Sequence, residues 1–208
     1  RFTSKTSDLI IKSGRDEFPG LAINEFLCMS VAKEVGIAVP EFYLSDNSKL
    51  FVMRRFDRDQ QLDPIGFEDM AALMGLAAEQ KYSKSYSAIA KAIRLFCPPE
   101  HMQSSLAQLF AIVTLSCIVG NGDAHLKNFG VLYTDPSDIR LAPMFDVLTT
   151  SIYKYTRFGT GEEIEDRTMA LKLRKGDKTR TYPLAKELLD LGRSACGVDR
   201  PHEFVQRA

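Results

Sequence analysis

A polar stretch at residues 120–129 (GNGDAHLKNF) most constrains how this chain can fold, because it lies between apolar segments of two different kinds. Before it, residues 106–120 form an apolar run with helical spacing. After it, residues 129–133 and 139–141 have the pattern of two strands around a Thr-Asp-Pro-Ser-Asp turn. We therefore expect a buried helix to lead into a polar loop, which in turn opens a hairpin.

Three residues of this region carry side-chain oxygens at a spacing that suits phosphoryl transfer. Asn128 follows Asp123 by five positions, and Asp146 follows Asn128 by eighteen, beyond the hairpin. Kinase-type transfer requires an Asp that orients a hydroxyl nucleophile, with an Asn and a second Asp that hold magnesium beside ATP. We predict Asp123 as the general base, Asn128 and Asp146 as Mg²⁺ ligands, and His125 and Lys127 as donors near the transferred phosphoryl group.

A purely structural turn is the alternative reading of this stretch. Asn-Gly-Asp is a good turn sequence, and an Asp followed by an Asn at this spacing often arises by chance. Catalysis is favoured because Asn, Asp, His and Lys crowd into eight residues between two apolar segments. A structural turn has little need of that polar density, nor of the second Asp that the hairpin delivers.

A lysine near the start of the chain repeats the same chemistry. Lys12 ends an apolar, strand-like run at residues 9–12, and Glu25 lies on the helix predicted to follow. In kinases a strand lysine on the phosphates is held by a helix carboxylate. We therefore predict that Lys12 and Glu25 bind ATP, the alternative being an exposed lysine at a strand end and a surface glutamate.

Strand-like segments gather in the first part of the chain. Besides residues 9–12, strands are predicted at residues 40–44 and 49–53. Between them we expect a helix that ends at Gly36 and whose mostly apolar face is formed by Ile23, Phe26, Leu27, Ser30, Val31, Glu34 and Val35.

The rest of the chain is mainly helical in pattern. Helical periods dominate residues 67–118, and a further helix is predicted at residues 184–191. These patterns predict an α+β fold of two lobes. The first, at residues 1–58, is small and strand-rich, and the second, at residues 59–208, is helical and carries the polar loop and the hairpin.

Composition limits the classes of function. The chain has 27 Lys and Arg against 27 Asp and Glu, so its net charge gives no reason to expect strong binding to nucleic acid or membrane. We find no apolar run of the roughly 18 residues that a membrane helix needs, and no signal peptide. The four cysteines are scattered without a CxxC pair, which favours free thiols in a reducing cytoplasm over disulfides or a zinc site.

Several separate motifs give the chain a resemblance to a known family. They are FPGLAINE at residues 18–25, RFDR at 55–58, NGDAHLKNFG at 121–130, LAPMFD at 141–146 and MALK at 169–172. In order and spacing they resemble the HipA-like serine/threonine kinase toxins. The sequences of residues 18–22 (FPGLA) and 54–59 (RRFDRD) are most similar to the short HipT branch of that family.

The resemblance implies a bilobal, protein-kinase-like fold that uses ATP and Mg²⁺. It implies the roles already given to Asp123, Asn128, Asp146 and Lys12, and it places His125 beside the phosphates. Residues 52–56 would carry the adenine contacts, with Met53, Arg54 and Phe56 among them. The family has Glu where Arg54 stands, so contacts made by that side chain would be lost while backbone contacts would remain.

The resemblance also implies partners. The protein substrate would be an aminoacyl-tRNA synthetase, whose phosphorylation stops translation and growth. A helix-turn-helix antitoxin of the HipB type would be the usual partner in the cytoplasm, with DNA bound only indirectly through it and with no membrane involved. The alternatives are a catalytically degenerate kinase fold that serves as a binding module for an antitoxin and its DNA, and a small-molecule or lipid kinase.

A Gly-rich phosphate loop with an autophosphorylated serine should precede Lys12 in this family, and residues 1–8 contain no such loop. The chain begins with Arg1 and enters a strand-like run at once. We therefore expect an N-terminal part that lies outside this sequence, the alternative being a protein that is inactive as given.

Overall fold

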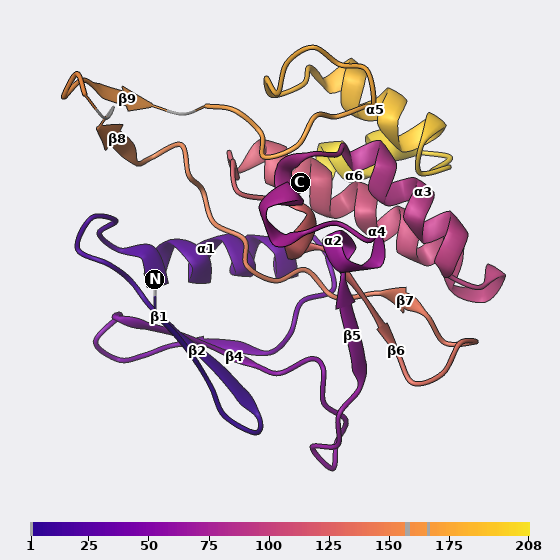
Figure 1. Ribbon diagram of the computed structural model, residues 1–208, viewed down its shortest axis with the longest axis horizontal. Helices are drawn as coiled ribbons and strands as arrows, with labels where there is room; N and C mark the ends of the chain where they lie inside the picture. Colours follow the sequence, from indigo (N-terminus) through magenta and orange to yellow (C-terminus); the bar gives the residue numbers. More distant parts are fainter. Residues whose placement is uncertain (1, 157–158, 166) are drawn as a thin grey trace.

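A computed structural model describes residues 2–156, 159–165 and 167–208 of the chain. Its first part is a four-stranded antiparallel sheet in the order β1-β2-β4-β3, formed by β1 (Phe2–Lys5), β2 (Leu9–Ser13), β3 (Phe42–Leu44) and β4 (Leu50–Arg54). Helix α1 (Leu21–Glu34) lies along one face of this sheet (Figure 1). The strands predicted at residues 9–12, 40–44 and 49–53 are confirmed, whereas β1 was not expected.

Helix α1 forms as predicted, but the apolar face predicted for it is only partly buried: Phe26 and Val35 pack in the core and other members do not. Its buried side includes Ala22, Glu25, Met29 and Ala32, while Ile23, Leu27 and Val31 on the other side are exposed. The helix is apolar on several sides, so periodicity alone could not choose between them. The small side chains of Ala22 and Ala32 let α1 approach the sheet, and Glu25 is buried because it meets Lys12.

A second, three-stranded sheet follows in the order β5-β6-β7, formed by β5 (Gly66–Asp69), β6 (Gly130–Tyr133) and β7 (Arg140–Leu141). The predicted hairpin is therefore confirmed as β6 and β7. Residues 67–69 were predicted as helical, which is wrong, because they pair with β6 instead. Asp69 then starts the short helix α2 (Met70–Leu73) by accepting a hydrogen bond from the Ala72 backbone N–H.

The helical part of the fold is built around α3 (Tyr86–Phe96) and α4 (Pro99–Ile118), which pack against each other. A short 3-10 helix, η1 (Ala78–Tyr82), precedes them. By length and composition alone α4 could cross a membrane, but Leu106, Leu109 and Phe110 are at most 1% exposed in the core of this fold. In this fold α4 is a buried core helix, which accounts for its length and apolar character.

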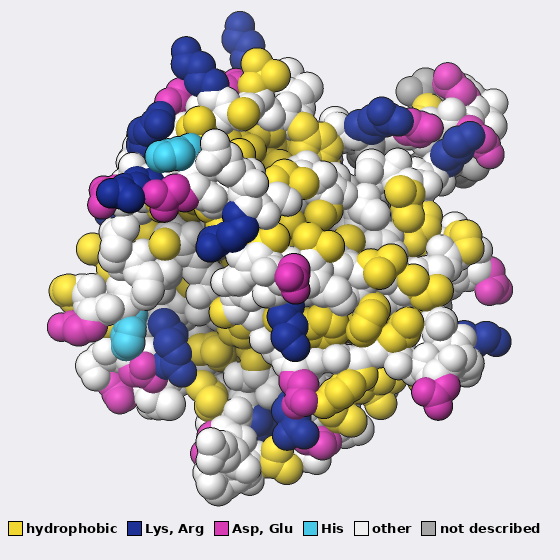
Figure 2. Space-filling view, turned by 180° about the vertical axis from the view of Figure 1, so that it is seen from behind, with side chains coloured by type: hydrophobic (Ala, Val, Ile, Leu, Met, Phe, Trp, Pro, Cys, Tyr) yellow, Lys and Arg dark blue, Asp and Glu magenta, His cyan; other side chains and the backbone are white. Residues whose placement is uncertain are grey.

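The chain ends in a projecting hairpin and two helices. Strands β8 (Lys154–Thr156) and β9 (Glu163–Glu165) form the hairpin, and α5 (Ala185–Ser194) and α6 (Pro201–Arg207) close the fold. Figure 2 shows the hairpin standing out from the body of the molecule, with positive and negative side chains next to one another. The helix predicted at residues 184–191 is confirmed as α5.

The arrangement of a sheet with one helix, followed by a mainly helical part, confirms the predicted α+β class. The first sheet ends at Arg54 and β5 begins at Gly66. The division into lobes after residue 58 stays a prediction.

Candidate functional site

Lys12, Glu25 and Asp146 form a charged triad that joins three parts of the fold. Lys12 lies on β2, Glu25 on α1, and Asp146 on the loop after β7. The ammonium nitrogen of Lys12 is 2.6 Å from Glu25 Oε1 and 3.0 Å from Asp146 Oδ1. The Lys12 and Glu25 side chains are only 8% and 1% exposed, so this pairing is shielded from water.

The loop that carries Asp123 is held closely to the segment that follows Asp146. The backbone N–H of Gly122 donates to Thr150 Oγ1 at 2.8 Å, and that hydroxyl donates to the Gly120 carbonyl at 3.1 Å. A Cβ on Gly122 would lie 2.6 Å from Thr150 Oγ1 and 2.7 Å from the Thr168 carbonyl. Glycine at 122 is therefore required for this close approach.

Asn24 fixes the same segment from the side of α1. Its Nδ2 donates to the Thr149 carbonyl at 2.9 Å and to Tyr153 Oη at 3.2 Å, while its Oδ1 accepts from the Thr149 backbone N–H at 2.9 Å. Asn24 is 6% exposed. The helix that supplies Glu25 thus also positions the segment against which the Asp123 loop rests.

Two residues of η1 contact the predicted catalytic residues. The Tyr82 hydroxyl donates to Asp123 Oδ1 at 2.9 Å, and Lys81 Nζ lies 2.8 Å from His125 Nε2. Asp123 is about half exposed, and its Oδ1 is also 3.8 Å from His125 Nε2. Asp123, His125, Lys81 and Tyr82 therefore form one cluster at the end of the loop.

The surroundings of His125 lower its pKa and so favour its neutral form. Burial is the main cause that lowers its pKa, and the Lys81 ammonium acts in the same direction, while the negative charge of Asp123 opposes them. A neutral imidazole can accept from Lys81 only through an unprotonated Nε2, so the ring proton sits on Nδ1. His125 Nδ1 is buried and has no hydrogen-bond partner among the described residues.

The donor set around Asn128 and Asp146 suits a magnesium ion. Asn128 Nδ2 donates to the Asp123 carbonyl at 3.1 Å and to the Asp146 carbonyl at 3.4 Å, which leaves Oδ1 as the free ligand atom of the amide. The structure describes no cluster of three or more His, Cys, Asp or Glu that could hold a metal. Mg²⁺ fits such a sparse site, because it binds one or two protein oxygens and keeps waters and phosphate oxygens as its other ligands.

Asp146 stands in an uncommon backbone conformation. Its φ is +56°, in the left-handed region, where an aspartate carries a cost that the surrounding contacts must offset. The ring of the preceding Phe145 packs against Phe56 and Phe67, with centroid distances of 4.9 and 5.9 Å. This packing and the Lys12 ion pair hold Asp146 toward the first sheet.

Lys127 is placed differently from the other predicted catalytic residues. Its ammonium is 2.9 Å from Asp69 Oδ2, the residue that caps α2. The structure thus gives Lys127 a contact with α2, and a role in catalysis stays a prediction.

The predicted adenine-binding residues lie at the end of β4 and just beyond it. Met53 is 1% exposed in the core, and Arg54 points to the surface with its Nε 3.1 Å from Glu41 Oε2. The Arg54 backbone N–H already donates to the Glu41 carbonyl. Phe56 reaches Asp146 indirectly, through its contact with Phe145. Adenine contacts by these residues stay a prediction.

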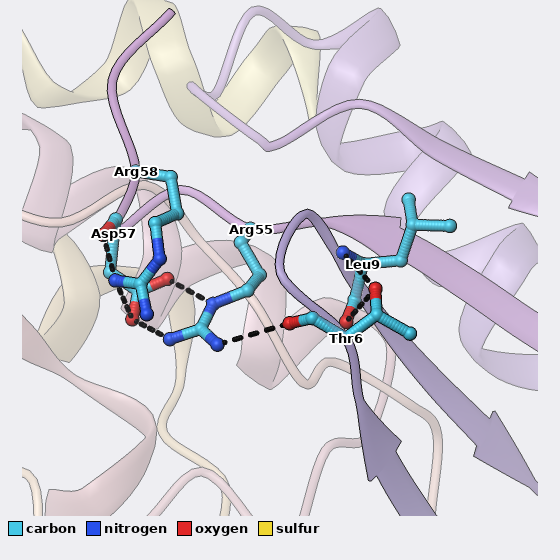
Figure 3. A network of polar contacts seen from close by, with 5 residues as sticks. All are labelled: Thr6, Leu9, Arg55, Asp57 and Arg58. Atoms are coloured by element: carbon cyan, nitrogen blue, oxygen red, sulfur yellow. Dashed lines mark hydrogen bonds and ion pairs between the residues drawn. The ribbon is translucent and has the colours of Figure 1, made fainter. Parts of the chain in front are cut away.

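An arginine network fixes the segment that connects the first sheet with β5 (Figure 3). Arg55 binds Asp57 through two bonds, Nε to Oδ1 at 2.8 Å and Nη2 to Oδ2 at 2.6 Å, and it reaches the Thr6 carbonyl at 3.3 Å. Arg58 donates to the Asp57 carbonyl at 2.7 Å. Hydrogen bonds from Arg55 are the main cause that lowers the pKa of Asp57.

A cavity of about 610 Å³ opens beside Asp123. Its lining includes Arg15, Tyr82 and Arg180, as well as Gly122 of the loop. A hydroxyl that enters this cavity can approach the Asp123 carboxylate, and the two arginines provide positive charge around it.

The sequence-based prediction missed Lys81, Tyr82, Asn24 and Thr150 as parts of this site. No motif used in that prediction included Lys81, Tyr82 or Thr150. Asn24 lies within the FPGLAINE motif at residues 18–25, but no role was predicted for it. These residues enter the site through tertiary contacts, which spacing along the chain does not show.

Comparisons with known proteins agree with this geometry. Residues 2–207 match the model of the HipA-like C-terminal domain. A Haemophilus influenzae protein named "Putative kinase" is 34% identical over 72% of the chain and 47% of its own length. The Shewanella oneidensis serine/threonine-protein kinase toxin HipA is 24% identical over 67% of the chain and 36% of its own length.

A solved structure of HipA from Shewanella oneidensis MR-1, in complex with HipB and operator DNA, has the same fold. It superposes with a TM-score of 0.75 over 96% of the chain, at 18% identity, and 48% of the HipA chain is covered. The present chain therefore spans less than half of each of these relatives.

Proposed function

The chain belongs to the family of HipA-like C-terminal domains, and from this premise we propose that it transfers phosphoryl groups from ATP to serine or threonine in a protein, with Mg²⁺. The observation that carries the proposal is the triad of Lys12, Glu25 and Asp146. Two of its three members are almost fully buried. A strand lysine, a helix glutamate and an aspartate are also the residue types with which kinases bind phosphate and magnesium, which supports the proposal. Relatives named as kinases support the same class of reaction.

Each residue of the site has a part in the proposed reaction. Lys12, steadied by Glu25, binds phosphate oxygens of ATP, and Asp146 and Asn128 hold Mg²⁺. When bound, Mg²⁺ neutralises negative charge on the phosphates. Asp123 orients the substrate hydroxyl and accepts its proton as the oxygen attacks phosphorus.

The cluster next to Asp123 completes the arrangement. Tyr82 donates to one carboxylate oxygen of Asp123, and Asp123 lines the cavity. Lys81 places a positive charge within 2.8 Å of His125, at the end of the site where negative charge develops on the transferred group.

We further propose that the parent protein is a toxin of a toxin–antitoxin system in the cytoplasm. The supporting observation is the structural match to HipA in its complex with HipB and operator DNA. A HipB-type helix-turn-helix antitoxin would then be its partner, with DNA bound through the antitoxin. On the family resemblance, its substrate would be an aminoacyl-tRNA synthetase, and its action would arrest translation and growth.

Phosphate transfer by the full-length protein tests the proposed reaction. We expect Asp123→Asn to lower the rate by about 100-fold to 10,000-fold, the usual contribution of a positioned general base. Asp135→Asn, in the turn between β6 and β7, should change little and serves as the matched control. An unchanged rate in Asp123→Asn would contradict the role given to that residue.

Nucleotide binding separates a kinase from a non-catalytic binding module. Titration with ATP in the presence and absence of Mg²⁺ should show metal-dependent binding by the wild type and its loss in Asp146→Ala. If metal changes binding in neither protein, the degenerate binding module is the better explanation.

Brief induction in a bacterial host, followed by phosphoproteomics, tests the substrate class. A new phosphorylated serine or threonine in an aminoacyl-tRNA synthetase is the expected result. New sites confined to other proteins would reject the synthetase as substrate. A new phosphorylated small molecule or lipid, found in extracts of the same cells, would favour the alternative of a small-molecule or lipid kinase.

A further inference from the structure

A second cavity adjoins the candidate active site and has a different character. Its volume is about 1100 Å³, and Tyr82 and Arg180 line both it and the cavity beside Asp123. Its walls come from η1, from α3 and from the segment at residues 172–180. A ligand in this second cavity, which we call the basic groove, would therefore lie next to the cavity where the substrate hydroxyl enters.

The basic groove concentrates positive charge in a chain without net charge. Besides Arg180, its lining includes six further cations, Lys84, Lys91, Lys172, Arg174, Lys175 and Lys178. Among the described residues that line it there is no Asp or Glu. Asp177, which lies within the same segment, uses its carboxylate to accept from the Arg174 backbone N–H at 2.7 Å.

These positive charges are available to a ligand. Within the described parts of the chain, none of the seven cationic side chains forms an ion pair, whereas Lys12, Arg55 and Lys127 each do. The chain as a whole has equal numbers of positive and negative residues. An uneven local distribution of this kind favours an anionic ligand over a cationic or neutral one.

The floor of the groove is apolar and mainly aliphatic. Leu73, Met74, Ala88, Ala92, Leu95 and Phe96 contribute to it, and Leu95 is 75% exposed. Single-stranded nucleic acid is bound by rows of aromatic side chains on which successive bases stack. Among the described residues that line the groove, Tyr82 and Phe96 are the only aromatic ones. An aliphatic floor beneath positive walls fits a peptide in which acidic and aliphatic side chains alternate.

One wall of the groove is held rigidly. The backbone N–H groups of Tyr86 and Ser87 donate to the carbonyls of Lys172 and Leu173 at 3.0 and 3.1 Å, and the Lys175 N–H donates to Ser87 Oγ at 3.2 Å. The segment is thus fixed to the first turn of α3 before any ligand arrives. Such pre-organisation reduces the entropy that binding would cost.

We propose that the basic groove binds an acidic segment of the protein substrate, with aliphatic side chains on its floor, and so brings a neighbouring serine or threonine to Asp123. The proposal rests on the proposed kinase function and defines its substrate further. It assigns recognition to a surface outside the residues that act on ATP. Positive charge at the groove would also steer acidic partners toward the site.

Binding of a short labelled peptide in which Glu alternates with Leu, measured by fluorescence anisotropy without ATP, tests the proposal. The probe contains no hydroxyl group, so the result does not depend on phosphoryl transfer. We expect the wild type to bind, and the triple variant Lys91→Glu/Lys175→Glu/Lys178→Glu to bind at least about tenfold more weakly, because each exposed reversal turns attraction into repulsion. Higher salt should weaken binding by the wild type.

A matched variant separates the groove from a general effect of charge. Lys33→Glu/Lys49→Glu/Lys186→Glu makes the same change in net charge with exposed lysines that do not line the groove. It should bind the peptide within about twofold of the wild type, and both variants should unfold at the wild-type temperature. Equal losses in the two variants would reject the groove as the binding site.

Two further probes complete the experiment. A peptide with Gln in place of Glu should bind much more weakly, and an oligoribonucleotide that bound more tightly than the Glu peptide, with loss only in the groove variant, would assign the groove to nucleic acid. Asp123→Asn should bind the Glu peptide like the wild type. If the full-length wild type bound the peptide but transferred no phosphate to any protein, the kinase function would be refuted and the groove would still be supported as a peptide-binding site.

Discussion

Tyr82 donates a hydrogen bond to the Asp123 carboxylate, the same group that would accept a proton from the substrate hydroxyl. Its hydroxyl is 2.9 Å from Asp123 Oδ1, and its ring lies against His125 with centroids 5.2 Å apart. Because a carboxylate has two oxygens, Tyr82 can hold one of them while the other receives the substrate. We therefore propose that Tyr82 positions Asp123, the proposed general base.

Tyr82→Phe tests this role. Removal of a hydrogen bond to a charged group costs about 1.5–3 kcal/mol, and we expect kcat to fall about 10-fold to 150-fold while the KM for ATP stays unchanged. Steady-state kinetics with the protein substrate provide the measurement. Tyr43→Phe, on β3 and away from the site, is the control, and an equal effect in both variants would contradict the assignment.

Gly122 tolerates no side chain without movement of its neighbours. The Cβ of Gly122→Ala would meet Thr150 Oγ1 and the Thr168 carbonyl, so we expect a loss of about 1–3 kcal/mol in the free energy of unfolding and a lower rate of phosphate transfer. Urea unfolding measures the first effect. Gly14→Ala, whose Cβ would come no closer than 3.5 Å to its surroundings, should change stability by less. If the two substitutions cost the same, the close approach at Gly122 is not what limits stability.

At the scale of elements, the segment between β4 and β5 depends on the pairing of Arg55 with Asp57. Arg55 holds the pKa of Asp57 below its usual value of about 3.9. A carboxyl whose pKa is lowered in the folded state stabilises the fold above its unfolded pKa, and this contribution is lost as pH falls through its folded pKa. The pair of Arg55 and Asp57 should therefore stabilise the fold at neutral pH and stabilise it less in acid.

Arg55→Ala should lower the free energy of unfolding by about 1–2 kcal/mol at neutral pH. The difference from the wild type should shrink as pH falls below about 4. Urea unfolding across this pH range gives the result. Arg200→Ala removes an exposed ion pair with Glu203 and should change stability by less than about 1 kcal/mol at any pH. A difference for Arg55→Ala that did not vary with pH would show that the pair acts through packing alone.

Elements whose pattern and partner lie close together in the sequence were predictable. The hairpin of β6 and β7 has a clear turn, and α3 and α4 follow strong helical periods. Strand β5 was taken as part of a helical region because its four residues become a strand only by pairing with β6, more than sixty positions away. The buried side of α1 was missed for a similar reason, since the position of Glu25 is decided by Lys12 on another element.

The candidate site likewise contains residues that the sequence predicted and residues that it did not. Asp123, Asn128 and Asp146 were found from spacing, because one loop and one hairpin connect them. Lys81 and Tyr82 lie about forty positions earlier and reach the site through η1. No local pattern marks a tyrosine that will meet an aspartate at that distance in sequence.

At the scale of the whole molecule, the Lys12 triad ties the first sheet, α1 and the loop after β7 together. In Lys12→Met the Glu25 carboxylate, 1% exposed, would lose the ammonium that balances its charge. Breaking a buried ion pair from one side typically costs 3–5 kcal/mol, and we expect a loss of about 3 kcal/mol here. Urea unfolding checks the value.

The double variant Lys12→Met/Glu25→Leu distinguishes stability from function. Replacement of both charges by apolar side chains should recover most of the lost stability, because it removes the buried charge as well as its partner. Phosphate transfer should remain absent, since the lysine that binds the phosphates is gone. Recovery of transfer together with stability would show that the triad is only structural.

The triad has a consequence for how such a protein could be controlled. In many protein kinases the pairing of the strand lysine with the helix glutamate is broken in the resting enzyme and is restored on activation. Here Lys12 and Glu25 are 2.6 Å apart, so this pair is formed. Inhibition of such a protein can therefore take one of two forms. Helix α1 moves and breaks this buried contact, or a partner covers the entrance to the site or the surface that receives the substrate.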